Sequence, residues 1–232
     1  MMELHISWLK IINLYLVSKV RIVRASHFLK STSRIATTFL CVLLSSCAGI
    51  GVISSSNPME NLNTAHTMFA SEDRPLIAER LIIQSIGVFK DKNDNLGLGD
   101  SYREYAELLS SPSVSGKWRT YYERNGFLDG STSYNNRENG ATHYYRKALG
   151  AYGAAILTLE ANHQYDKLTN AYYNAAIINV ALGNIQEGCS NYNLALAAYS
   201  DNMEANPGVK PYAPDGSFEK FIDAKKKDIG CH

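Results

Sequence analysis

The chain has 232 residues, of which 23 are Lys or Arg and 22 are Asp or Glu, so its formal net charge is only +1. This balance excludes a globally basic protein that binds nucleic acid through its charge, and we expect no nucleic-acid partner. An apolar content of 45% and 15 tyrosines exclude a wholly disordered or collagen-like chain. The charge is spread unevenly: residues 1–46 hold six basic side chains and one acidic one, which leaves 17 basic and 21 acidic from Cys47 onward.

We predict a signal region over residues 1–46, and its part from residue 29 onward has the layout of an export signal. Lys30 and Arg34 precede an apolar stretch, residues 35–44, which two serines follow. Such a stretch is too short to span a bilayer as a permanent helix, and charges ahead of a short apolar run are typical of a signal peptide. Residues 1–29 lie ahead of this signal and are apolar and basic. We interpret them as the result of a translation start assigned too far upstream, with a first membrane helix as the alternative.

The end of this signal carries a motif. Leu44-Ser45-Ser46-Cys47 resembles the lipobox of bacterial lipoproteins, in which a large aliphatic residue and two small ones precede a cysteine. The resemblance implies that the Cys47 thiol receives diacylglycerol, that the signal is cut just before it, and that the new amine is acylated. Each buried CH₂ contributes about 0.8 kcal/mol, so the acyl chains hold the domain at a membrane. In this interpretation residues 47–57 are the lipid anchor and a tether, and Ala48 after the cysteine favours the outer membrane. The alternative is that Cys47 is an ordinary small residue in a core helix.

Two other cysteines remain outside the signal, Cys189 and Cys231. Two thiols in an exported domain commonly pair, so we predict a disulfide bond between them, with two free thiols as the alternative. The bond would close a loop of about 42 residues and stabilise the fold by about 3 to 4 kcal/mol in the chain-entropy model. No Cys/His spacing typical of zinc is present, and we expect no metal and no cofactor. The histidines after the signal are isolated in the sequence: His66, His143, His163 and His232.

From residue 58 the apolar residues follow helical spacing, with breaks between the runs. We predict helices over residues 59–70, 75–90, a third that carries Leu98 to Leu109, then 141–162, 166–182 and 185–201, and a last amphipathic helix within 217–230. Pro75 suits the first turn of the second helix, and the polar residues 93–97 end it. No segment alternates convincingly with a period of two residues, so we expect an all-α fold.

The sequence also repeats itself. With an offset of 70 residues, one triplet falls on another: Leu98, Tyr102 and Ala106 on Leu168, Tyr172 and Ala176. Residues 171–200 resemble a tetratricopeptide repeat, with a large aromatic at Tyr172, a small residue at Ala176 and the small crossing residue of the second helix at Gly188. The resemblance implies that residues 58–203 form a short solenoid of about three helical hairpins with an insertion at 112–140, and that residues 204–232 form a tail and a capping helix.

In tetratricopeptide proteins the first helix of each hairpin lines a concave groove that binds peptides or partner domains. Transferring that arrangement by position predicts a protein-binding groove lined by Asp100, Arg103 and Glu107 from one helix and by Asn170, Tyr173, Ile177 and Ala181 from another. The insertion adds aromatic residues of the kind that dominate interfaces: Trp118, Tyr121, Tyr122, Phe127 and Tyr134. The alternative is that these aromatics bury themselves against the repeats.

Sequence motifs for chemistry are missing, since the chain has no GxSxG, no phosphate-binding glycine loop and no HExxH. We interpret Glu104 and Glu107, with Arg103, as a solvated helix face rather than an acid/base pair. The sequence therefore predicts a non-enzymatic, membrane-tethered scaffold in the bacterial envelope that binds a protein. It would act in assembly of a secretion or pilus machine, or as an immunity protein against a periplasmic toxin. The alternative is a lipoprotein that binds cell-wall carbohydrate or assists an enzyme.

Overall fold

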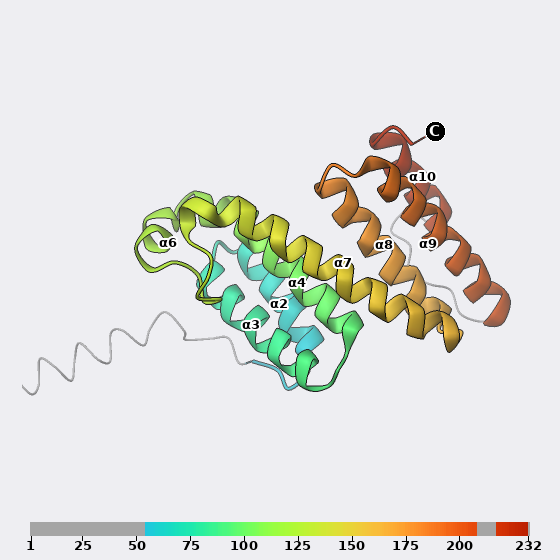
Figure 1. Ribbon diagram of the computed structural model, residues 1–232, viewed down its shortest axis with the longest axis horizontal. Coiled ribbons are helices and arrows are strands. Elements are labelled where there is room, and N and C mark those ends of the chain that lie inside the picture. Colours follow the sequence, from blue (N-terminus) through green and yellow to red (C-terminus); the bar gives the residue numbers. More distant parts are fainter. Residues whose placement is uncertain (1–53, 208–216, 232) are drawn as a thin grey trace, which may run out of the picture. The chain divides into compact units, whose positions relative to one another are not determined.

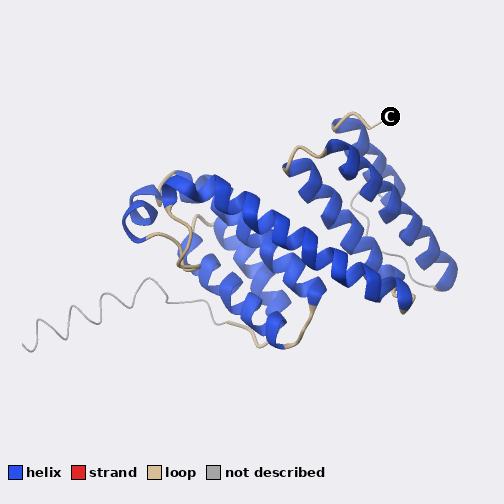
Figure 2. Ribbon diagram, viewed as in Figure 1, coloured by secondary structure: helices blue, strands red, loops and turns tan. Residues whose placement is uncertain are grey.

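The computed structural model describes residues 54–207 and 217–231, which belong to one compact unit, Ile53–His232. Within these ranges all regular structure is helical, which confirms the all-α prediction (Figure 2). The longer helices are α2 (Pro58–Ala70), α3 (Pro75–Asp91), α4 (Asn95–Ser110), α7 (Arg137–Ala161), α8 (Tyr165–Ala181), α9 (Ile185–Ala205) and α10 (Phe218–Asp228). Two short helices, α5 (Pro112–Ser115) and α6 (Arg119–Asn125), and a 3₁₀ turn, η2 (Tyr134–Asn136), lie between α4 and α7.

The predicted signal and the predicted lipidation site, Cys47, lie outside the described residues. In the ranges 54–207 and 217–231, none of the helices is both long and apolar enough to span a membrane.

The longer helices pack in successive pairs. Helix α2 packs on α3, α4 on α7, and α8 on α9, while contacts of α3 with α4 and of α7 with α8 join one pair to the next (Figure 1). Only a few residues separate α2 from α3 and α8 from α9, so the helices of these two pairs run antiparallel. Helix α4 also contacts both α2 and α8, and the first helices of the three pairs therefore lie next to one another.

Side-chain caps place the starts of several helices. The Asn57 side chain accepts a hydrogen bond from the Met59 backbone N–H at 3.0 Å, and the Asp94 side chain accepts one from Gly97 N–H at 3.0 Å. These bonds satisfy amide groups that have no partner within the helix. Just before Asp94, Asn93 has a φ of 53°, a left-handed conformation that Asn tolerates better than most residues. The polar segment after α3 thus ends one helix and begins the next.

Close approach of paired helices depends on glycine at two positions. A Cβ atom on Gly99 of α4 would lie 2.6 Å from the Tyr152 ring of α7, and one on Gly188 of α9 would lie 2.8 Å from Val180 of α8. Both distances are shorter than van der Waals contact allows, so a larger residue would push the helices of the pair apart. Gly188 is the residue that the sequence predicted as the small crossing position.

The C-terminal helix α10 packs on α9 and is joined to it by a disulfide bond between Cys189 and Cys231, whose Cα atoms are 5.7 Å apart. The bond confirms the predicted pairing. Ile222 of α10 is fully buried, and Phe221 packs beside the ring of Tyr173 on α8. Helix α10 therefore covers apolar side chains on the last helix pair.

The insertion between α4 and α7 is held by one buried carboxylate, that of Glu79 on α3. Oε1 of Glu79 accepts hydrogen bonds from the Tyr105 hydroxyl at 2.9 Å and from the Leu128 backbone N–H at 2.6 Å, and Oε2 accepts one from the Tyr122 hydroxyl at 3.3 Å. Burial raises the pKa of Glu79 to about 6, although these three donors oppose the increase. The Phe127 ring stacks on Tyr122 with centroids 4.4 Å apart. The insertion thus has a small core of its own, and hydrogen bonds to the Glu79 carboxylate attach this core to α3.

Candidate functional site

A recess in the described part of the chain crosses the first helices of the three pairs. Its volume is about 380 Å³, and α2, α4 and α8 all contribute to its walls. We call it the groove. It is lined by Met59, Leu62 and Asn63 of α2, by Asp94, Leu96, Gly97, Asp100, Arg103 and Glu104 of α4 and its cap, and by Lys167, Asn170 and Asn174 of α8.

Sequence analysis placed several residues toward a groove, and the structure brings some of them together. Arg103 and Asn170 line the groove, and Glu107 is bonded to Arg103 at its edge. Tyr173 is half-buried and lies among the aromatic rings of α9 and α10, with its centroid 6.1 Å from that of Tyr192. Ile177 is half-buried and is not part of the groove lining. The residues near the start of α8 therefore line the groove, whereas Tyr173, farther along the helix, packs against α10.

Arg103 is the centre of the charged part of the groove. Its two terminal nitrogens bind one carboxylate each, Nη1 to Oε1 of Glu107 at 2.6 Å and Nη2 to Oε1 of Glu104 at 2.7 Å. The Glu104 side chain is almost fully buried, which corrects its interpretation as part of a solvated helix face. Burial raises the pKa of Glu104; the Arg103 charge opposes this increase and the Glu107 charge adds to it. Two carboxylates thus share one cation in a partly desolvated place.

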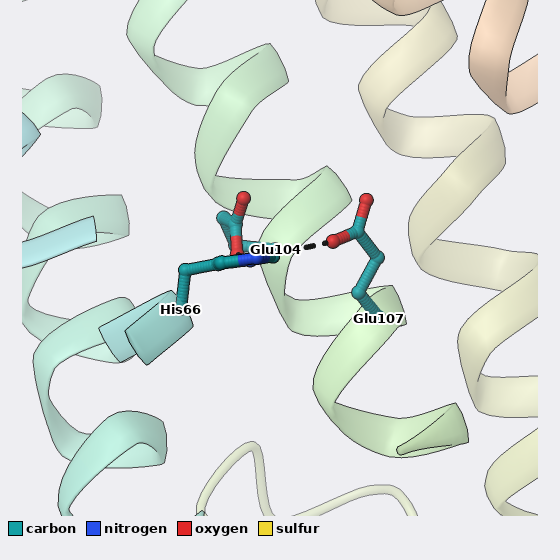
Figure 3. A group of neighbouring side chains, drawn as sticks. All are labelled: His66, Glu104 and Glu107. Atoms are coloured by element: carbon teal, nitrogen blue, oxygen red, sulfur yellow. Dashed lines mark hydrogen bonds and ion pairs between the residues drawn. The ribbon is translucent and has the colours of Figure 1, made fainter. Parts of the chain in front are cut away.

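His66 completes this cluster from a different helix. In Figure 3 its imidazole extends from α2 toward both carboxylates of α4, with Nδ1 3.0 Å from Oε2 of Glu104 and 3.7 Å from Oε2 of Glu107. The sequence treats His66 as isolated, because its partners are 38 and 41 positions away along the chain. Packing of α2 against α4 brings His66 close to these two carboxylates, and no local sequence pattern predicts this contact.

A second polar group lies deeper between α4, α7 and α8. The Asp100 carboxylate accepts a hydrogen bond from the Tyr152 hydroxyl at 2.5 Å and another from the Asn174 side-chain amide at 3.1 Å. Burial raises the pKa of Asp100, while these two donors and the charge of Arg103 favour the ionised form. Sequence reasoning missed Asn174, although its spacing of four residues from Asn170 places both amides on one face of a helix.

The aromatic residues of the insertion have mixed environments. Tyr122 is fully buried, and Phe127 and Tyr134 are nearly so. These three side chains therefore follow the alternative prediction, burial, and are not accessible to a partner. Trp118 is half-buried and its indole N–H donates to the backbone oxygen of Asp73 at 2.8 Å. Tyr121 is 42% exposed. Of the predicted anchors, Tyr121 and part of Trp118 remain available to a partner.

Comparison with known proteins finds no family model that matches the chain, and no curated protein or solved structure that matches it. The groove offers amide groups, two cations and several carboxylates on three adjacent helices, a combination suited to binding a polar extended ligand.

Proposed function

We propose that this chain is a non-enzymatic, lipid-anchored scaffold of the bacterial envelope, a tetratricopeptide-like solenoid that binds a protein partner in the groove. The observation that carries the proposal is that the groove crosses the first helices of all three pairs. In tetratricopeptide-like solenoids these helices face the concave side, where extended peptides bind. The pairing of α2 with α3, α4 with α7 and α8 with α9 supports the same assignment.

The side chains of the groove support an extended peptide as the ligand. Asn63 and Asn170 are exposed amides on opposite sides of the groove, and an amide can donate to a peptide carbonyl and accept from a peptide N–H. The partner itself is then a component of a secretion or pilus machine, or a toxin that the chain neutralises.

Binding through the groove is tested by replacing Asn63 and Asn170, its two exposed amides, with alanine. We expect the double variant to lose partner binding by about tenfold or more, since each lost hydrogen bond to a peptide contributes about 1 kcal/mol. The partner is captured by cross-linking from the solubilised envelope, identified by mass spectrometry, and its dissociation constant is measured with each purified chain.

The matched control is another pair of exposed amides, Asn135→Ala in η2 with Asn139→Ala in the first turn of α7. This pair lies away from the groove lining, and its replacement should leave the dissociation constant unchanged. Equal affinity of the groove variant and the wild type would contradict the proposal. Binding to isolated peptidoglycan that is lost in Tyr121→Ala would instead favour the carbohydrate-binding alternative, because Tyr121 is the exposed ring of the insertion.

The lipid anchor has its own test. Mass spectrometry of the native mature protein should find a lipid-modified N-terminus at Cys47, and Cys47→Ser should move the protein from the membrane fraction to the soluble one. Loss of the acyl chains removes a contribution of about 0.8 kcal/mol per buried CH₂, so the change in partition should be nearly complete. A native protein that begins with an intact Met1 and carries no lipid would contradict this part of the proposal.

A further inference from the structure

We propose that His66, Glu104 and Glu107 form a binding site for a divalent transition-metal ion, with Zn²⁺ as the ion that suits these ligands. The three side chains come from two packed helices and present one nitrogen and two carboxylate oxygens to the same point (Figure 3). Imidazole nitrogen and carboxylate oxygen are both regular ligands of Zn²⁺ in proteins. The site does not depend on the proposed protein partner, since metal binding is measured without one.

The distances between the ligand atoms match a shared ion. His66 Nδ1 lies 3.0 Å from Oε2 of Glu104 and 3.7 Å from Oε2 of Glu107, and all three atoms lie within 4.8 Å of one another. Ligands placed about 2.0 to 2.2 Å from a tetrahedral Zn²⁺ are about 3.4 Å apart, which falls between the two measured separations. Both separations from the imidazole nitrogen therefore lie within about 0.4 Å of the spacing that a shared tetrahedral ion requires.

Arg103 would not contact the ion itself but would hold the two carboxylates in the orientation that the ion needs. Its guanidinium binds Oε1 of Glu104 and Oε1 of Glu107, and the Oε2 atom of each carboxylate is the one that faces His66. Hydrogen bonds to the second oxygen of a ligating carboxylate fix its direction and are a regular part of metal sites. The same arrangement limits competition, because Arg103 and an ion would use different oxygens.

Charge and access also favour a cation. Glu104 and Glu107 together carry two negative charges when ionised and Arg103 carries one positive charge, so the cluster has a net charge of about −1 with His66 neutral. The His66 side chain is 52% exposed, which gives an ion a direct path from solvent. Three protein ligands leave at least one coordination position for water or for a group of a bound partner.

The alternative to a metal site is a simple hydrogen bond between His66 and Glu104. Such a bond occupies one carboxylate, whereas the Oε2 atoms of both Glu104 and Glu107 are turned toward Nδ1. Arg103 balances only one of the two carboxylate charges, and an ion bound at the Oε2 atoms would neutralise the remaining negative charge, which is why we prefer the metal site.

Equilibrium dialysis against ZnCl₂ at pH 7.5 tests the site. The probe is Zn²⁺ alone, and the protein is the full chain without a polyhistidine tag, with its disulfide intact and any free thiols alkylated. We expect about one Zn²⁺ per chain for the wild type and an affinity at least tenfold weaker for His66→Gln and for Glu107→Gln. Zn²⁺ should also raise the thermal midpoint of the wild type and leave that of His66→Gln unchanged.

The matched control is His143→Gln, which removes an exposed histidine of α7 whose ring contacts Tyr144. Its affinity for Zn²⁺ should equal that of the wild type. Absence of saturable binding, or equal binding by the wild type and His66→Gln, would overturn the proposal. Because His66 is exposed, its replacement leaves the fold intact, and the far-UV circular dichroism of each variant verifies this.

Discussion

Replacement of Glu79 by alanine is expected to lower the free energy of unfolding by about 3 kcal/mol or more and to release the insertion from the body of the protein. Glu79 accepts hydrogen bonds from Tyr105, Tyr122 and the backbone N–H of Leu128. Both tyrosines are fully buried, so their hydroxyls would lose this acceptor without access to bulk water. Each buried donor left without a partner costs about 1 to 3 kcal/mol.

The prediction is measured by urea unfolding at pH 7.5, followed by circular dichroism, together with limited trypsin digestion. Cleavage after Lys117 and Arg124 should become faster in Glu79→Ala, because Tyr122 and Leu128 lie in the insertion that the carboxylate holds. Arg80→Ala, which removes the exposed neighbour of Glu79 on α3, is the control and should change the stability by less than about 0.5 kcal/mol. Equal stability and equal cleavage rates in Glu79→Ala and the wild type would contradict the role assigned to Glu79.

Glu79→Gln separates the charge of this side chain from its hydrogen bonds. Burial raises the pKa of Glu79 from its ordinary value of 4.5 to about 6 in the folded protein, so the folded state takes up a proton at a higher pH than the unfolded chain. The stability gained by protonation is fully present below about pH 4.5 and is lost as the pH rises through about 6. A shift of this size corresponds to about 2 kcal/mol. The free energy of unfolding of the wild type should therefore fall, relative to that of Glu79→Gln, as the pH rises from 4.5 through 6. Parallel curves of unfolding free energy against pH for the two proteins would contradict this prediction.

Local sequence patterns were sufficient for the longer helices, because the signals that begin and end a helix are local. Pro75 begins a helix where the sequence places it, and the apolar spacing of residues 59–70 and 166–182 gives helix bounds within one residue of those observed. Residues 93–97, which were predicted only to end the second helix, also begin the next one, since α4 starts at Asn95. Helix α7 begins at Arg137, four residues earlier than predicted. The residues just before 141 are polar, and such residues fit a turn ahead of a helix as well as its first turn, so the pattern could not locate the start. The arrangement of pairs follows from short turns and from small residues such as Gly188.

The candidate site was harder to predict because its parts come from separate helices. The sequence assigned Arg103 and Asn170 to helix faces, which are a local property, and both residues line the groove. The burial of Glu104 and Tyr122 could not be derived in this way, because it is decided by what a second helix or the insertion places over them. Glu79 attracted no notice in the sequence, where one glutamate in an apolar helix gives no sign of the three donors that converge on it.

Removal of the disulfide, by Cys189→Ser together with Cys231→Ser, is expected to lower the free energy of unfolding by about 4 kcal/mol. The two cysteines are 42 residues apart, and in the chain-entropy model a bond that closes such a loop restricts the unfolded chain by about this amount. The bond also keeps α10 beside α9, where Ile222 is fully buried and Phe218 stacks on Tyr199 with centroids 4.8 Å apart. Without it, α10 is held by these contacts alone and should open more often than the rest of the fold.

Urea unfolding and hydrogen exchange measure the two effects. The midpoint for the double serine variant should fall below that of the wild type, and the amides of α10 should exchange faster while those of α4 and α7 keep the rates set by the rest of the fold. Ile222→Ala in the disulfide-bonded chain is the matched comparison, because it weakens the packing of α10 by about 2 to 5 kcal/mol and leaves the covalent link in place. If the serine variant unfolds at the same urea concentration as the wild type, and its α10 amides keep their protection, the packing of α10 alone determines its position. The bond between Cys189 and Cys231 would then have no part in the stability of the last helix pair.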